Sequence, residues 1–182
     1  MTRLQLIVTI CFSSVWLSAC NQNQVSTNTA GDKDSVTTAS VADQKQVTFK
    51  DARIDTAFES YITLKNALVA SDVSLAQNAA SVLSEALDQI KGCQNTADIA
   101  RRISGSTALD QQRKEFTTLS DDFIALIKHA DIQEGTTYVQ YCPMANSGEG
   151  GYWMASTDEI RNPYYGDEML NCGEVKEELT RK

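Results

Sequence analysis

The chain has 182 residues, of which 24 are acidic and 16 are basic, and its formal net charge is −8 at pH 7. An acidic protein is repelled by phosphate backbones and anionic lipid headgroups, so nucleic acid and anionic membrane surfaces are not expected as partners. Once the N-terminal segments described next are set aside, about 135 residues remain, which is enough for one domain and not two.

Residues 1–19 have the pattern of a secretory signal peptide, because Arg3 precedes an apolar run at 4–16 that is too short to span a bilayer. The run ends in Leu17-Ser18-Ala19-Cys20, which resembles the bacterial lipobox. This resemblance implies lipidation of Cys20 and a position on the periplasmic side of a bacterial membrane. Asn21 at the next position favours the outer membrane. The alternative interpretation is an ordinary cleaved signal with a chance cysteine.

Residues 21–46 consist mostly of Gln, Asn, Ser, Thr, Asp and Ala, with no aromatic residue and no apolar period. Such a segment buries too little apolar surface to offset the entropy lost on ordering. We therefore predict a disordered tether behind the lipidated Cys20, which holds a single domain, residues 47–182, away from the membrane.

Apolar residues recur at spacings of three and four in the first part of this domain, as Ile54, Phe58 and Tyr61 illustrate. This period predicts four helices, at 48–70, 73–91, 96–103 and 107–130. Gly92 stands where a left-handed residue would end the second helix. Because the connections are short, we predict a mainly α fold, an antiparallel helical bundle of three long helices and one short helix.

The period changes after residue 135. Thr, Tyr and Val alternate over 136–142, which predicts a strand, and Tyr152-Trp153-Met154 can pair with it across a Gly-rich turn at 146–151. A tight turn at Pro163 and Gly166 and a short polar tail at 174–179 follow. We therefore predict a small irregular C-terminal cap at 136–175, which contains a β-hairpin and is packed against the bundle.

Two cysteines and two methionines occur in pairs at the two ends of this cap, as Cys142 with Met144 and Met169 with Cys172. Thiolates and thioethers are the soft ligands that favour Cu(I), and the same chemistry suits Ag(I). The four residues are therefore candidate metal ligands. A Cys142–Cys172 disulfide is the main alternative, since disulfides form outside the cytoplasm. The two thiols could also be inert and buried, and the methionines could be core filler.

Other residues with chemical potential have simpler interpretations. We expect Cys93 to pack as a small apolar residue after Gly92, and His129 to complement the dipole at the end of the fourth helix. Trp153, Tyr164 and Tyr165 are expected in the core of the cap. With one histidine and no activated nucleophile, the sequence gives no support for catalysis, so we expect a protein that is not an enzyme.

Short motifs run through most of the domain, at Tyr61, Leu64-Lys65 and 67–69; at Gln112-Arg113, Phe116 and Leu119-Ser120; at 138–145; at Tyr152-Trp153, Ser156 and Ile160; and at 162–166, Met169-Leu170 and 172–175. They resemble a domain family of unknown function that occurs in bacterial lipoproteins and is also appended to membrane-fusion proteins of heavy-metal efflux systems. The resemblance implies a periplasmic role near copper or silver export, and it points at Cys142, Met144, Met169 and Cys172. Family members often carry a histidine in the third helix, where this chain has Ile99-Ala100-Arg101-Arg102.

The leading expectation is a lipid-anchored periplasmic protein that binds Cu(I) or Ag(I) without turnover. It would sequester the metal or deliver it to a heavy-metal efflux membrane-fusion protein. The alternative is a non-catalytic structural or interaction lipoprotein in which Cys142 and Cys172 form a disulfide and the helical face or the aromatic cap docks a protein partner.

Overall fold

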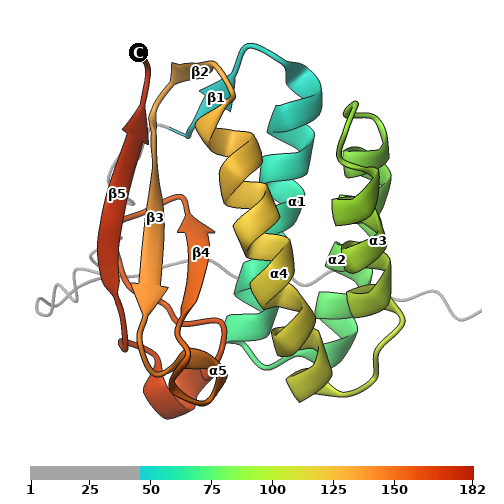
Figure 1. The fold of residues 1–182 in the computed structure, drawn as a ribbon, viewed down its shortest axis with the longest axis vertical. Helices are drawn as coiled ribbons and strands as arrows, with labels where there is room; N and C mark the ends of the chain where they lie inside the picture. The colour runs from blue at the N-terminus through green and yellow to red at the C-terminus, as the bar shows by residue number, and fades with distance from the viewer. Residues whose placement is uncertain (1–45) are drawn as a thin grey trace, which may run out of the picture. The chain divides into compact units, whose positions relative to one another are not determined.

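Figure 1 shows the fold of residues 46–182, the part of the chain that the computed structural model describes. The predicted signal peptide, Cys20 and nearly all of the predicted tether lie outside these residues. The four predicted helices are present, with ends that differ by a few residues: α1 Ala52–Val69, α2 Val73–Asp88, α3 Gln94–Ser104 and α4 Leu109–Lys128.

Each helix packs against the next along the chain, α1 on α2, α2 on α3 and α3 on α4. In Figure 1, α1 and α4 lie next to the strands, and α2 and α3 lie on the side away from them. Their inward faces carry fully buried apolar side chains, among them Leu64, Leu68, Leu83, Leu87, Ile103 and Leu119. The arrangement agrees with the predicted helical bundle.

The strands form two antiparallel sheets, so the fold is mixed and the predicted mainly α class is too narrow. One sheet pairs β1 (Thr48–Phe49) with β2 (Ile132–Glu134). The other has the strand order β4-β3-β5 and consists of β4 Gly151–Ala155, β3 Thr136–Cys142 and β5 Glu174–Thr180. The predicted hairpin of β3 and β4 is confirmed, with Gln140 opposite Trp153.

The prediction of a polar tail at 174–179 is wrong, because this segment is β5 and pairs along β3. Only Val175 and Leu179 have half-buried side chains on β5, and the glutamates between them are exposed. An edge strand has one neighbour, and charged side chains there prevent pairing with other chains. The sequence therefore looks polar although its backbone is bonded in a sheet, and the predicted hairpin of the cap is extended by a third strand.

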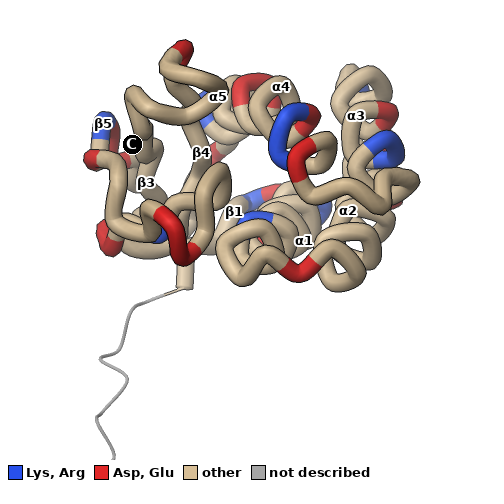
Figure 2. The backbone as a smooth tube through the Cα atoms, turned by 90° about the horizontal axis from the view of Figure 1, so that it is seen from below, with Lys and Arg blue, Asp and Glu red and all other residues tan. Residues whose placement is uncertain are grey.

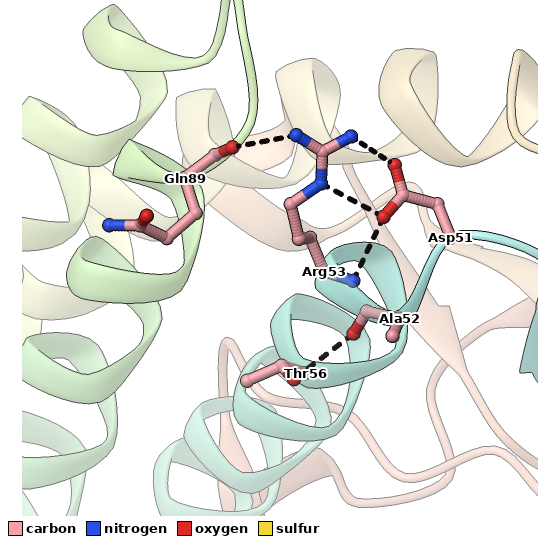
Figure 3. A network of polar contacts seen from close by, with 5 residues as sticks. All are labelled: Asp51, Ala52, Arg53, Thr56 and Gln89. Carbon is pink, nitrogen blue, oxygen red and sulfur yellow. Dashed lines mark hydrogen bonds and ion pairs between the residues drawn. The ribbon is translucent and has the colours of Figure 1, made fainter.

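Helix α1 begins at Ala52 and not at residue 48, because Asp51 caps it. The Asp51 carboxylate accepts from the Arg53 backbone N–H at 3.0 Å and from its guanidinium at 2.6 and 2.9 Å, as Figure 3 shows. These bonds to Arg53 lower the pKa of Asp51 to about 2. The same guanidinium donates to the Gln89 carbonyl at the C-terminal end of α2, at 3.2 Å. The start of α1 is thereby joined to the end of α2.

The second helix is shorter than predicted, because α2 ends at Asp88 and not at residue 91. Gly92 does adopt the left-handed conformation, with φ of +94°, but it lies in the turn between α2 and α3. Cys93 follows it at the N-cap of α3, where it is half-buried and packs against the core, as expected.

Most charged residues of α3 and α4 have exposed side chains, and Figure 2 marks where they occur along the backbone. Arg102 on α3 pairs with Glu115 on α4 at 2.9 Å, and Arg101 pairs with Asp88 at the end of α2. Because exposed ion pairs of this kind contribute about 0–1 kcal/mol each, they align neighbouring helices more than they stabilise them.

A row of aromatic rings joins the bundle to the sheet. Tyr61 on α1 stacks on Phe123 and Phe116 of α4, with ring centroids 4.3 and 5.4 Å apart. Phe116 in turn contacts Tyr164 at 5.9 Å, and Tyr164 meets Trp153 of β4 edge-on at 6.0 Å. Pairs with these geometries are favourable beyond their buried area. Trp153 and Tyr164 are therefore core residues, as predicted, while Tyr165 is half-buried.

The Tyr61 hydroxyl connects the same elements by hydrogen bonds. It shares a bond of 2.7 Å with the Ser120 hydroxyl of α4 and accepts from the Met154 backbone N–H of β4 at 3.1 Å. Tyr61 is fully buried, so no water can take over these bonds.

Replacing Tyr61 with phenylalanine is expected to lower the free energy of unfolding by about 1–3 kcal/mol, because it leaves the buried Met154 N–H without an acceptor. Urea denaturation of the two proteins measures the difference. Tyr152→Phe is the control, since Tyr152 is 40% exposed and should tolerate the change. Equal stability of the Tyr61→Phe and Tyr152→Phe proteins would contradict the role assigned to the Tyr61 hydroxyl.

Candidate metal site at the Cys142–Cys172 pair

The structure brings Cys142 and Cys172 together, as both sequence hypotheses required. Cys142 is the last residue of β3, opposite Gly151 of β4, and is fully buried. Cys172 is half-buried and follows the short helix η1 (Gly166–Met169). Their Sγ atoms are 2.6 Å apart, and both residues are free thiols in this structure.

The segment before Cys172 is fixed by Asn162, which is fully buried. The Asn162 side-chain amide donates to the Cys172 carbonyl at 2.9 Å, and its backbone N–H donates to the Leu170 carbonyl at 2.8 Å. The Asn162 Oδ1 atom accepts from the Tyr164 N–H at 2.8 Å. One asparagine thus positions both Cys172 and an aromatic residue of the core. Asn162 belongs to the motif at 162–166, but the sequence pattern gives it no role of its own.

Gly173, directly after Cys172, allows the chain to pass close to Trp153. Its φ is +151°, and a Cβ at this position would lie 2.9 Å from the Trp153 ring and 3.0 Å from the Tyr141 carbonyl. A larger residue here would push Cys172 away from Cys142.

The two methionines lie at the surface, in contrast to the core-filler alternative. Met144 is 52% exposed and Met169 is 37% exposed. Met144 precedes the single turn α5 (Ala145–Gly148), and its carbonyl accepts from the Tyr165 hydroxyl at 2.5 Å. The Met169 carbonyl accepts from the Cys172 backbone N–H at 3.0 Å. Both thioether side chains therefore come from backbone positions that adjoin the cysteine pair.

The turn after Met144 has a left-handed backbone at two non-glycine residues, Asn146 with φ of 53° and Ser147 with φ of 60°. The Asn146 side chain compensates by donating to the Gly150 carbonyl at 2.8 Å and accepting from Thr117 of α4 at 3.0 Å. Left-handed non-glycine residues cost about 1–2 kcal/mol each, so side-chain bonds of this kind are needed to hold the turn.

The electrostatic surroundings favour the protonated thiol at Cys172. Its pKa is raised by the hydrogen bond with Cys142 and by burial, and the Met144 backbone N–H opposes this shift. Burial also raises the pKa of the Cys93 thiol at the start of α3. A metal ion at the pair would have to displace protons, which makes metal affinity increase with pH.

His129 has the capping role that we predicted. It is the C-cap residue of α4, and its Nδ1 atom lies 2.8 Å from the Ala125 carbonyl of the preceding turn. The other candidate ligand types are scattered: within residues 46–182, no group of three or more His, Cys, Asp or Glu side chains is placed to hold a metal ion. The thiols of Cys142 and Cys172 are donors of the soft type, the type that suits soft metals rather than hard cations.

No helix within residues 46–182 combines the length and the apolar character needed to cross a bilayer.

Residues 57–135 match the family model described as "Protein of unknown function (DUF3347)". The matched region runs from α1 to the end of β2, so it holds the helices and stops before the Cys142–Cys172 pair. The similarity to a domain of unknown function is thereby supported for the helical part. Comparison with curated proteins and with solved structures gave no match.

Proposed function

We propose that the reduced Cys142–Cys172 pair binds a soft metal ion, Cu(I) or Ag(I). The observation that carries this proposal is the 2.6 Å separation of two free thiols that come from different segments of the chain. Met144 and Met169 supply exposed thioethers from neighbouring backbone positions. This donor set has the softness that separates Cu(I) from harder cations.

Metal binding requires the two sulfurs to move apart. Metal–thiolate bonds are about 2.3 Å long, so two sulfurs on one ion cannot stay 2.6 Å from each other. Cys142 is fixed in the sheet and fully buried, whereas Cys172 is half-buried in the connection between η1 and β5. We therefore assign the movement to Cys172, the less buried of the two cysteines.

The proposed role follows from the N-terminal pattern and from the exposed ligands. The protein would be held by a lipid at Cys20 on the periplasmic side of a bacterial membrane, the outer membrane being favoured by Asn21. A site with surface thioethers can pass its metal to another protein, so sequestration and delivery to a heavy-metal efflux membrane-fusion protein are both consistent with it. No turnover is proposed.

A second candidate function is a structural or interaction lipoprotein with a Cys142–Cys172 disulfide. The observation in its favour is again the Sγ–Sγ distance of 2.6 Å, since unbonded sulfurs rarely approach so closely and a disulfide bond is about 2.0 Å long. Closing a loop of this length would contribute about 3 kcal/mol in the chain-entropy model.

Anaerobic titration of the reduced protein with Cu(I), against a Cu(I)-specific chelator, tests the first candidate. One ion per chain is expected, with affinity at least about a hundredfold weaker in Cys142→Ser and in Cys172→Ser, beyond the 10–100-fold typical of outer-shell changes. Met144→Leu and Met169→Leu should weaken binding less. Cys93→Ser is the matched control and should bind as the parent does.

Two results would separate the candidates. If the Cys142→Ser protein competes with the chelator as strongly as the parent protein does, the metal proposal is wrong. If the protein is isolated with a Cys142–Cys172 disulfide and its reduced form does not compete, the structural candidate takes its place.

A further inference from the structure

A cavity of about 790 Å³ lies between the first half of α4 and the turn α5. Figure 2 shows α5 beside α4, and the two walls are joined where Thr117 of α4 donates to the Asn146 Oδ1 atom at 3.0 Å. Tyr164 and Tyr165 also line the cavity. Ligand sites are typically cavities of about 300–1,000 Å³ with a few polar groups among aromatic ones. The volume and the lining therefore fit a ligand site that is separate from the cysteine pair.

Arg113 on the α4 wall is a cation held in place by neutral groups. Its Nε atom donates to the Pro163 carbonyl at 2.9 Å, and its Nη2 atom donates to the Leu68 carbonyl at 3.1 Å and to the Ser71 hydroxyl at 3.0 Å. Within residues 46–182 the guanidinium makes no ion pair, and its Nη1 atom has no hydrogen bond. Arg113 is thus a fixed positive charge with one nitrogen to spare.

The spare nitrogen is open to solvent. In the described part of the chain, the one fully enclosed side-chain atom without a partner is Gln112 Oε1, so the unbonded Nη1 atom of Arg113 is not sealed in the core. Since Arg113 lines the cavity, this atom can be reached from it. An arginine whose other bonds are already made loses little freedom when it binds an anionic oxygen, and such a charge-assisted bond is strong.

The opposite wall is formed by a strained turn that carries an acidic group. Asn146 and Ser147 line the cavity and are both left-handed, a conformation that in non-glycine residues is concentrated at ligand sites. Glu149 follows them on the same wall, with an exposed side chain. The cavity is thus bordered by a fixed cation on α4 and by a carboxylate on the turn.

We propose that this cavity binds a short peptide with free termini, the terminal carboxylate on Arg113 and the terminal ammonium on Glu149. Asp110 and Lys114 complete a lining with two acidic and two basic residues, which suits a ligand without net charge. A single amino acid would fill only a small part of the volume. The exposed hydroxyl of Thr118 is available to the peptide groups between the termini. This inference is independent of the metal proposal.

An NMR titration of the ¹⁵N-labelled protein with trialanine tests the proposal. The amide signals of Thr117, Thr118 and Ser147 are expected to shift. Trialanine amide and N-acetyl-trialanine should each bind at least about tenfold more weakly, because each lacks one charged end. The carboxylate is tested by changing the peptide, since Arg113 also holds two backbone carbonyls and its replacement could unfold the protein.

Two pairs of variants locate the site. Glu149→Gln should weaken the binding of trialanine and leave that of N-acetyl-trialanine unchanged, while Glu85→Gln removes an exposed glutamate on α2 and is the control. Thr118→Trp fills the cavity from an exposed position and should abolish binding. Thr63→Trp makes the same change at an exposed site on α1 and should bind as the parent does.

No shift in the parent protein at about 10 mM trialanine, a concentration that reveals a Kd of about 1 mM, overturns the proposal. Equal affinity for trialanine and its amide does so as well, because Arg113 would then not hold the carboxylate. Undiminished binding by the Thr118→Trp protein would place any bound peptide outside this cavity and is the third contradicting result.

Discussion

Trp153→Ala is expected to lower the free energy of unfolding by about 3–5 kcal/mol, the range typical for removing a buried tryptophan. Trp153 is fully buried and meets Tyr164, so its loss leaves a cavity between the sheet and the connection that follows β4. Its indole N–H also donates to the Gln140 Oε1 atom at 2.7 Å. The substitution would therefore leave a buried acceptor without its donor in addition to the cavity.

Urea denaturation followed by far-UV circular dichroism measures this change without relying on tryptophan fluorescence. Tyr152→Ala in the same strand is the matched control, because Tyr152 is 40% exposed and its removal opens no cavity in the core. If the two variants lose the same stability, the packing role assigned to Trp153 is wrong.

Gly166→Ala is expected to lower the free energy of unfolding by about 2–5 kcal/mol. Gly166 begins η1 with φ of +58°, a left-handed conformation that costs other residues about 1–2 kcal/mol. A Cβ there would also lie 2.7 Å from the Val69 carbonyl oxygen and 2.8 Å from the Ser71 hydroxyl. Relieving such contacts in a packed region costs about 1–3 kcal/mol more. The end of α1 and the start of η1 must separate to admit the methyl group.

Gly148→Ala isolates the conformational part of this effect. Gly148 has φ of +94°, but a Cβ there would have no atom within 4 Å. The Gly148→Ala protein should therefore lose only the cost of the left-handed conformation, about 1–2 kcal/mol in the free energy of unfolding. Thermal unfolding of both variants decides the matter, and a Gly166→Ala protein no less stable than Gly148→Ala would refute the steric contribution.

The helices could be predicted from the sequence because each buries one continuous face, so that residues such as Phe58 and Tyr61 recur at helical spacing. The ends of the helices were harder to predict. Asp51 starts α1 with a side-chain bond that outweighs the apolar pattern before it, and residues 48–49 join a sheet with β2. Strand β5 was missed because an edge strand leaves most of its side chains in water.

The meeting of Cys142 with Cys172 was foreseen from the paired Cys and Met residues at the two ends of the cap. The part that was missed is the role of Asn162. Its side-chain amide donates to the Cys172 carbonyl, its Oδ1 atom accepts from the Tyr164 N–H, and its backbone N–H donates to the Leu170 carbonyl. A pattern of residue types along one segment contains no information about such contacts, because the partners are backbone atoms that only the fold brings into reach.

Under the metal proposal, the contacts of Tyr61 connect metal binding to the rate at which the protein is degraded. Because this side chain ties two helices to β4, the sheet that carries Cys142 is expected to open only together with the bundle, as one cooperative unit. A ligand that binds the folded state alone then protects every part of that unit against proteases. Under the metal proposal, copies of the protein that carry metal would be degraded more slowly than empty copies, so the amount of protein would itself follow the metal supply.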